Sequence, residues 1–371
     1  MTNDPMLKAM EEADAAKAAK LFEEMVRRGE KAWDIHLSLF PLVQRVLNPP
    51  FINPHLPKMY CICGELKPYL TETEIPSFVH LEVMEYSRRP KLEELSKVAV
   101  PSSPVSFGDI ETAIRSEDRK AAAIAMAGFL SQRGASDLAR RLLVLGSAYL
   151  SQSLGHSVSC TAFILLELLA RPKEDPWPAL AALADYFCKG KFAASPALRR
   201  LAPFSPDEAI KHHLSRAVSG RGIVNLHHAI TVYAMERVRH LFDEKEYGHM
   251  IDSWITFLGN KSADSHFGED TRAEPITSYD QFYELFSALE AKPLSARVGR
   301  MIGTPEGRQN LSRFFVKGLC DRHRGNYNPH CITGLGAALW VLHRFADQPA
   351  LAMRALFQYT DFLFDSIKSG N

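Results

Sequence analysis

Helix start signals recur along this chain, and they restrict its fold more than any other feature. The segment Ser205-Pro206-Asp207-Glu208 has a serine able to cap a helix, a proline at the first helical position and an acid three residues after the cap. Thr304-Pro305-Glu306 begins in the same way, and further start signals stand at Ser106, Ser136 and Ser278. Such residues satisfy backbone N–H groups that only a helix end leaves free. The chain is therefore predicted to consist largely of helices.

Apolar residues are spaced as they are on one face of a helix. They recur at intervals of three and four in a long stripe that contains Leu226, Ile230, Ala234, Val238 and Leu241. Strand signals are scarce, since sustained apolar–polar alternation and Asn-Gly or Asp-Gly hairpin turns are missing. Pro41 should kink or split the helix that contains it. We predict an all-α fold, with helices near residues 6–29, 31–47, 156–171, 225–242 and 330–345 among others.

The sequence of 371 residues indicates a single domain. We find no fixed repeat of the length that builds helical solenoids, and no segment with the composition of a linker. We expect a compact multi-helix domain that spans residues 1–371 and has a buried central pocket. The N-terminal helix within residues 1–30 could lie at the periphery of this domain.

The composition of the chain limits the binding partners and the cell compartment that we expect. The chain has 44 Lys and Arg against 43 Asp and Glu, a net charge of +1. It therefore lacks the excess of positive charge that binding to nucleic-acid phosphates requires. Six scattered cysteines are too few for a disulfide framework, which indicates a reducing cytoplasm. The N-terminus lacks a signal-peptide pattern, and no apolar run approaches the roughly 20 residues that span a bilayer. We expect a cytoplasmic protein that neither enters a membrane nor binds nucleic acid.

Three of the fourteen histidines share a local pattern. His156, His228 and His330 are each followed two residues later by Val or Ile, and three residues later by Ser or Thr. The sixth residue after each of them is small: Ala162, Ala234 and Gly336. Separations of 72 and 102 residues are too unequal for a solenoid repeat. They suit separate helices that meet at a common centre.

Each of these three histidines is expected in the first turn of a helix. Gly155, Asn225 and the pair Asn328-Pro329 precede them, and each is a typical start or turn residue. The positive end of a helix dipole disfavours imidazolium, so the rings should be neutral, which is the form that coordinates metal. The alternative interpretation is structural, with the imidazoles filling the core or bonding to the first turn.

A fourth imidazole could come from one of two positions, His55 or His36. His55 ranks first, because it lies in the proline-stiffened turn between Asn53 and Pro57. His36 lies among apolar residues, and His227 would replace His228 if the helical register is shifted by one residue. Four histidine ligands from separate segments suit non-haem iron or zinc, and the core of a helical bundle is a usual place for them.

An aromatic pocket should adjoin such a site. Its candidate walls are Tyr60, Tyr233, Tyr327 and Trp340, although each of them alone could equally be a core residue. Other common chemistries lack their motifs, because the chain has no Gly-Lys-Ser/Thr phosphate loop, no His-Glu-x-x-His zinc motif and no Gly-x-Ser-x-Gly elbow.

These histidine segments resemble the questin oxidase-like family. The resemblance runs from about Asn53 to Trp340, and it rests on Asn53-Pro54-His55-Leu56-Pro57, Gly155-His156-Ser157-Val158, Leu226–Thr231 and Pro329–Thr333. It implies a largely helical protein that opens rings of polycyclic aromatic compounds such as anthraquinones by oxidation, with NADPH as the reductant. The chain departs from the family pattern at Lys58, where a further histidine is expected, and at Thr333, where a lysine often follows the last histidine.

We therefore predict an oxidoreductase: a non-haem iron oxygenase of the monooxygenase type that acts on a polycyclic aromatic or quinone-like small molecule. The iron would be held by His55, His156, His228 and His330, with an open coordination position for oxygen. The alternative is a helical ligand-binding or interaction protein without catalysis, whose histidines are structural. A third hypothesis is a pocket that binds haem through one histidine.

Overall fold

The all-α prediction is confirmed in the described part of the chain. The computed structural model describes residues 4–97, 103–198, 204–260, 274, 276–325 and 327–370. These residues form twenty α-helices and two short 3₁₀ helices, and their only extended pairings are two isolated antiparallel bridges. Among the same residues, no helix is both long enough and apolar enough to cross a membrane.

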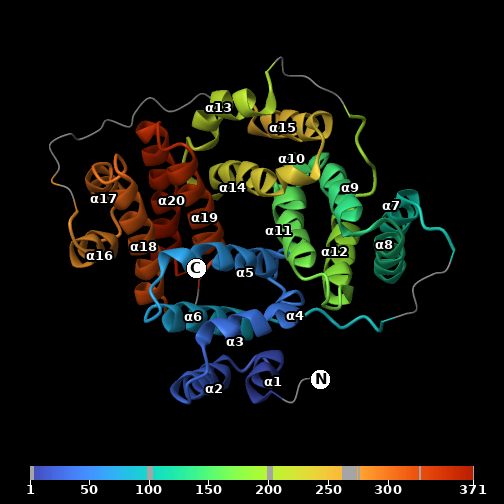
Figure 1. The fold of residues 1–371 in the computed structure, drawn as a ribbon, viewed down its shortest axis with the longest axis horizontal. Helices are drawn as coiled ribbons and strands as arrows, with labels where there is room; N and C mark the ends of the chain where they lie inside the picture. The colour runs from blue at the N-terminus through green and yellow to red at the C-terminus, as the bar shows by residue number, and fades with distance from the viewer. Residues whose placement is uncertain are drawn as a thin grey trace.

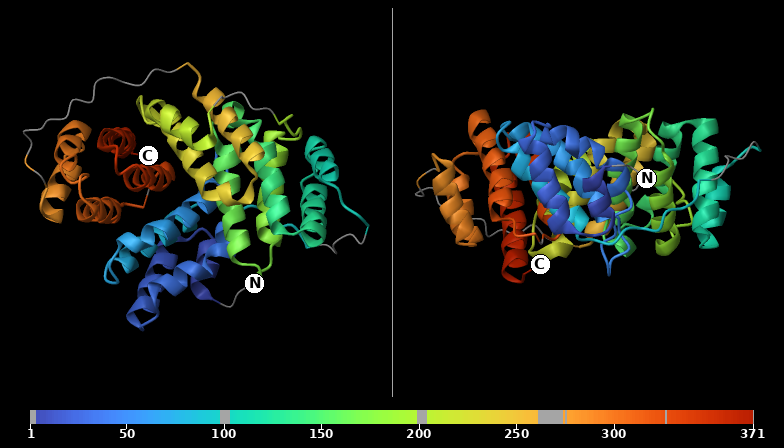
Figure 2. Two further views of the ribbon diagram at one scale, coloured as in Figure 1. Left: turned by 45° about the horizontal axis from the view of Figure 1, so that its top comes forward. Right: turned by 90° about the horizontal axis from the view of Figure 1, so that it is seen from below.

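The N-terminal helices pack along one side of the molecule (Figures 1 and 2). They are α1 (Pro5–Glu11), α2 (Ala15–Arg27), α3 (Ala32–Ser38), α4 (Phe40–Val43), α5 (His55–Leu66), η1 (Lys67–Tyr69) and α6 (Ile75–Ser87). Helices α1 and α2 pack on each other and on α6. The single helix predicted over residues 6–29 is two helices, because the backbone turns at Ala13 with φ +59° and Asp14 caps α2. The split expected at Pro41 is confirmed, since Pro41 lies in the first turn of α4.

The remaining helices complete the molecule. The middle of the chain forms α7 (Phe107–Arg115), α8 (Arg119–Arg133), α9 (Ala135–Ser147), α10 (Leu150–Ser153), α11 (His156–Ala170) and α12 (Trp177–Gly190). The later part forms α13 (Pro206–Ala217), α14 (Gly222–Val238), η2 (Arg239–Leu241), α15 (Glu244–Leu258), α16 (Tyr279–Ser287), α17 (Ala291–Val298), α18 (Pro305–Arg322), α19 (His330–Arg344) and α20 (Pro349–Lys368). Helices α7 and α8 stand at one end of the long axis, and α16 and α17 stand at the other (Figure 1).

Most of the predicted helix caps are confirmed. Ser205 and Ser106 each form a capping box with the acid three residues later, Glu208 and Asp109. Ser278 and Thr304 accept a backbone hydrogen bond at the starts of α16 and α18. Ser136 is the exception, because α9 begins one residue earlier, after Gly134.

Four helices form a closed circuit in the middle of the molecule. Helix α5 packs on α11, α11 on α14, α14 on α19, and α19 again on α5. Figure 1 shows these four helices around the centre of the view. Segments far apart in the sequence therefore meet at one place, as the spacing of the histidine pattern predicts.

Small residues let these helices approach each other closely. Gly155, immediately before α11, has φ +76°, and a Cβ atom there would lie 1.9 Å from Thr231 Oγ1 on α14. A Cβ atom at Gly336 of α19 would lie 2.6 Å from the Ile62 side chain on α5. Two contacts of the circuit thus depend on the absence of a side chain.

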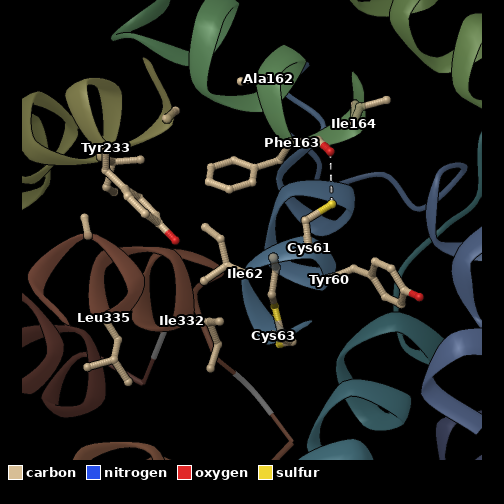
Figure 3. Packing of buried hydrophobic residues seen from close by; sticks show 14 of the residues in the cluster. Tyr60, Cys61, Ile62, Cys63, Ala162, Phe163, Ile164, Tyr233, Ile332 and Leu335 are labelled. Atoms are coloured by element: carbon tan, nitrogen blue, oxygen red, sulfur yellow. Dashed lines mark hydrogen bonds between the residues drawn. The ribbon is translucent and has the colours of Figure 1, made fainter. Parts of the chain in front are cut away.

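An apolar core fills the space inside the circuit. In Figure 3, Ile62 of α5 points between Phe163 of α11, Tyr233 of α14 and Ile332 of α19, and all four residues are buried. The Cys61 thiol contacts the Phe163 backbone oxygen at 3.2 Å. Because protein interiors are close-packed, this core holds the four helices at fixed separations and positions the side chains at their ends.

Candidate metal centre

Four imidazoles meet where the four helices of the circuit converge. The Nε2 atom of His156 lies 2.8 Å from that of His55 and 3.0 Å from that of His227. The Nε2 atoms of His227 and His330 are 2.9 Å apart, and the rings of His330 and His55 have centroids 4.8 Å apart. We call these residues the four-histidine cluster: one each from α5, α11, α14 and α19.

The local structure that presents each imidazole is similar at three of the four positions. His55, His156 and His330 are the first residues of their helices, while His227 is the sixth residue of α14. Three helix N-termini therefore point toward the cluster, and their dipoles disfavour a positive charge on the rings. The prediction that these histidines begin helices is confirmed for His156 and His330.

Hydrogen bonds fix the orientation of three of the rings. The Nδ1 atoms of His156 and His227 contact the backbone oxygens of Ser153 and Ile223, each at 2.7 Å. The Nδ1 atom of His330 contacts Asn328 Oδ1 at 2.7 Å. Because these oxygens can only accept, each Nδ1 carries the proton, and in the neutral ring Nε2 then carries a lone pair.

His55 is oriented from a different direction. Asn48 Nδ2 lies 3.3 Å from His55 Nδ1, and Asn48 Oδ1 accepts a hydrogen bond from Arg89. The ring also makes a hydrogen bond with the Asn53 backbone, which acts to raise the pKa of His55 against the stronger effect of burial. Asn48 and Asn53 thus orient this ring together.

The contacts of His227 Nε2 with His156 Nε2 and with His330 Nε2 lack a proton. His156, His227 and His330 all direct a lone pair at a neighbour 2.9–3.0 Å away, which is repulsive between neutral rings. Two nitrogens bound to one metal ion at about 2.1 Å lie about 3.0 Å apart when their bonds are at right angles, and about 3.4 Å apart at a tetrahedral angle. The observed separations match neighbouring ligands at right angles.

Burial keeps the imidazoles neutral. Desolvation lowers the pKa of His55, His156 and His330 well below the ordinary value, and nearby positive groups lower it further. The pKa of His227 falls to about 3, mainly through desolvation and then through Lys58. All four side chains are at most 5% exposed. Neutral imidazoles are ready to accept a cation, because no proton has to leave first.

Three of these rings also satisfy a simple geometric condition for a metal site. His55, His156 and His330 each offer a ring nitrogen, and these atoms all lie within 4.8 Å of one another. His227 adds a fourth nitrogen through its contacts with His156 and His330. The sequence-predicted residues His55, His156 and His330 are thus brought together.

The remaining predicted ligand, His228, lies outside the cluster and is replaced by its neighbour. Its ring contacts Phe257 edge-on at 4.7 Å, and its backbone oxygen accepts from Trp254 Nε1. The expected helix start at Asn225 placed His228 in the first turn, but α14 begins at Gly222. One residue changes direction by about 100° on a helix, so His227 faces the cluster instead.

His36, the other alternative, takes part in a separate buried network. Its Nδ1 atom lies 2.8 Å from Glu82 Oε2, so the ring donates to that carboxylate. The ring stacks between Trp33 and Tyr60, with centroid separations of 4.0 and 4.3 Å. His36 is therefore a satisfied core histidine.

Lys58 is a component of the site that the sequence patterns did not identify as functional. It lies one turn after His55 on α5, is completely buried, and its Nζ atom has no hydrogen-bond partner among the described residues. Its charge is one of the causes that lower the pKa of all four cluster histidines. Burial in turn lowers the pKa of the Lys58 amine. The signals in the sequence are its position three residues after His55 and its place where the resembled family has a further histidine.

A cavity of about 350 Å³ opens onto the four-histidine cluster. All four imidazoles line it, together with apolar side chains that include Phe51, Ile52, Leu154, Phe192 and Ile223. Its volume is at the lower end of the range for small-molecule pockets. A ligand in this cavity would touch the exposed side of the cluster directly.

The predicted aromatic walls are wrong, because none of them lines this cavity. Tyr60 stacks on His36 and bonds to Arg171, while Tyr327 donates to the Leu319 backbone oxygen. Tyr233 bonds to Glu65 and packs near Trp340. Figure 3 shows Tyr60 and Tyr233 on opposite sides of Ile62.

Comparisons of the chain with family models, with curated proteins and with solved structures find no match.

Proposed function

We propose that this protein is a metal-dependent oxidoreductase in which the four-histidine cluster binds one non-haem iron ion. The observation that carries the proposal is the pair of Nε2–Nε2 contacts that join His156, His227 and His330 at 3.0 and 2.9 Å without a proton between them. A cation at their centre would turn this repulsion into three coordinate bonds. Imidazole nitrogen is a common ligand of iron, so the residues present would fit such an ion.

The residues around the cluster fit that role. Metal-ligating histidines commonly donate their second ring proton to a carbonyl or carboxylate, which fixes the ring and makes the ligand nitrogen more basic. His156, His227 and His330 have such acceptors in Ser153, Ile223 and Asn328. An iron ion held by these four imidazoles would lie beside the cavity that they line, and it would supply activation of dioxygen.

We propose a substrate with an apolar aromatic ring system for the adjoining cavity. Phe51 and Phe192, with aliphatic neighbours, provide a surface for a flat apolar molecule, and the cavity restricts its size. The resemblance of the histidine segments to the questin oxidase-like family supports oxidative ring opening of a polycyclic or quinone-like compound. In a monooxygenase reaction of that kind, one oxygen atom enters a carbon–carbon bond beside a carbonyl, and the other leaves as water. NADPH and one solvent proton supply the two electrons and two protons.

In this reaction the chain itself would hold and orient the reactants. The helix N-termini and the buried position keep the imidazoles unprotonated, while the apolar walls exclude water from the substrate face. The hydrogen bonds on Nδ1 hold the rings in place when a substrate enters or leaves the cavity.

Metal analysis and oxygen uptake test this function directly. Purified protein reconstituted with iron(II) should retain about one iron per chain, whereas His156→Ala and His330→Ala should retain much less. The reconstituted wild type should consume oxygen when a hydroxyanthraquinone and NADPH are both supplied. If the wild type binds no iron, or if the alanine variants bind as much as it does, the proposal is wrong and the histidines are structural.

A further inference from the structure

We propose that the natural ligand of this cavity is an organic anion whose charged group binds the metal directly while its apolar body lies against the cavity rim. The inference rests on the proposed metal centre and goes beyond it, because it specifies the charge of the substrate and the residues that recognise it.

The first argument is the charge of the site. The side chains that line the cavity include no aspartate and no glutamate. The four histidines are neutral ligands, so a bound divalent ion would keep its full charge of two. Lys58, behind the cluster, cannot offset this charge, because an amine is either neutral or positive. An ion held only by neutral ligands in a partly desolvated site is stabilised when an anion completes its coordination.

The second argument is a cation at the cavity rim. Lys189, in the last turn of α12, lines the cavity and pairs with Asp185 at 2.8 Å. Asp185 also lies 3.6 Å from Arg119, so these three residues together retain one positive charge. Lys189 therefore adds to the attraction for an anion that enters the cavity.

The third argument concerns the apolar part of the ligand. Only six large hydrophobic side chains are markedly exposed among the described residues, and three of them line this cavity. Phe51 is 58% exposed, Ile52 44% and Leu154 37%. Exposed apolar side chains that gather at one concave place mark a binding site more often than scattered ones do. A simple inorganic anion would leave these three side chains uncovered.

The backbone at Leu154 supports the same conclusion. Leu154 has φ +51°, a conformation that is costly for a residue with a side chain, and it directly precedes Gly155 and His156. This conformation places Leu154 at the cavity while the next turn begins the helix that carries His156. The surrounding fold thus maintains an unfavourable backbone geometry at the rim of the site.

Cobalt(II) in place of iron gives a test that does not depend on catalysis. The visible spectrum of the cobalt-loaded protein is titrated with benzoate, with azide and with benzyl alcohol, which matches benzoate in its apolar part but is neutral. We expect saturable spectral changes with both anions, and benzoate binding at least about tenfold tighter than that of benzyl alcohol.

Two variants, each with a control variant, separate the contributions to binding. Lys189→Gln should weaken benzoate and azide by about three- to tenfold without loss of cobalt, whereas Lys191→Gln, on an exposed residue paired with Glu117, should not. Phe51→Ala should weaken benzoate and leave azide unchanged, and Phe204→Ala, an exposed phenylalanine outside the cavity, serves as its control.

The outcomes distinguish the two proposals. Failure of the wild type to bind cobalt overturns the metal centre itself. If cobalt binds but neither benzoate nor azide changes its spectrum, or if benzyl alcohol binds as tightly as benzoate, the metal centre stands and the anionic ligand is wrong. If azide alone perturbs the spectrum, the apolar body of the ligand is wrong.

Discussion

The Nε2 atoms of His156 and His227 lie 3.0 Å apart although each ring donates its Nδ1 proton to a backbone oxygen. Neutral imidazoles in this arrangement turn lone pairs toward each other, and their burial opposes the extra proton that would relieve the contact. Such a pair is understandable as two ligands of one cation. Most of the function proposed for this protein depends on that relationship.

Adjacent histidines provide the sharpest test of the ligand set. His227→Ala should lower the affinity for iron or cobalt by about 10- to 100-fold. It removes one ligand and also the ring that His156 and His330 contact. His228→Ala alters a residue that is equally buried but packs on Phe257, and it should leave metal affinity nearly unchanged. Isothermal titration with cobalt(II) measures both. Equal losses in the two variants would contradict the assignment of His227.

The stability of the metal-free protein should depend on pH in a defined direction. Burial lowers the pKa of the cluster histidines in the folded state, to about 3 for His227, while the unfolded chain keeps values near 6.5. As the pH falls below 6.5, the unfolded state therefore binds protons that the folded state does not. The free energy of unfolding should fall with decreasing pH, by up to about 1.4 kcal/mol per pH unit for each histidine.

Urea denaturation between pH 7.5 and 4.5 measures this dependence. The His227→Gln variant should show a shallower slope than the wild type, because one depressed titration has been removed. A wild-type stability that stays constant or rises as the pH falls over this range would refute the prediction.

Lys58 should reduce the stability of the metal-free protein. Its amine is completely buried and lacks a hydrogen-bond partner among the described residues, so Lys58→Met should raise the free energy of unfolding by about 1–3 kcal/mol. Lys97→Met, at an exposed position, should change it by less than about 0.5 kcal/mol. Chemical denaturation at pH 7.5 compares the variants, and a loss of stability in Lys58→Met would show that the amine has a stabilising role.

Asn328 should influence metal affinity through the His330 ring, which it orients. Its Oδ1 atom accepts from His330 Nδ1 at 2.7 Å and from the His330 backbone N–H at 3.0 Å. Asn328→Ala should weaken metal binding about 10- to 100-fold, while Asn328→Asp, which keeps an acceptor, should retain most of the affinity. Cobalt titration of both variants gives the comparison. Equal affinities in Asn328→Ala and the wild type would show that the hydrogen bond has no influence on the metal.

The sequence predicted the helices well because their signals are local. A capping box at Ser205 or Ser106 satisfies backbone groups within one turn, so no other part of the chain has to be known. Local start signals also predicted correctly that His156 and His330 lie at helix starts. The prediction from local signals failed at Ser136, since α9 begins after Gly134, and at the long N-terminal helix, which is interrupted at Ala13.

By itself, then, the sequence determined that this chain is all-α and that histidines from separate segments begin its inner helices. Only the tertiary structure decided which imidazoles meet. The choice of His227 over His228 depends on where α14 begins, since one residue rotates a side chain by about 100°. Lys58 and the walls of the cavity likewise became recognisable only after α5, α11, α14 and α19 had closed their circuit. Hydrogen bonds within a helix turn are set by neighbours in sequence, whereas the direction in which a turn faces is set by the packing of distant helices.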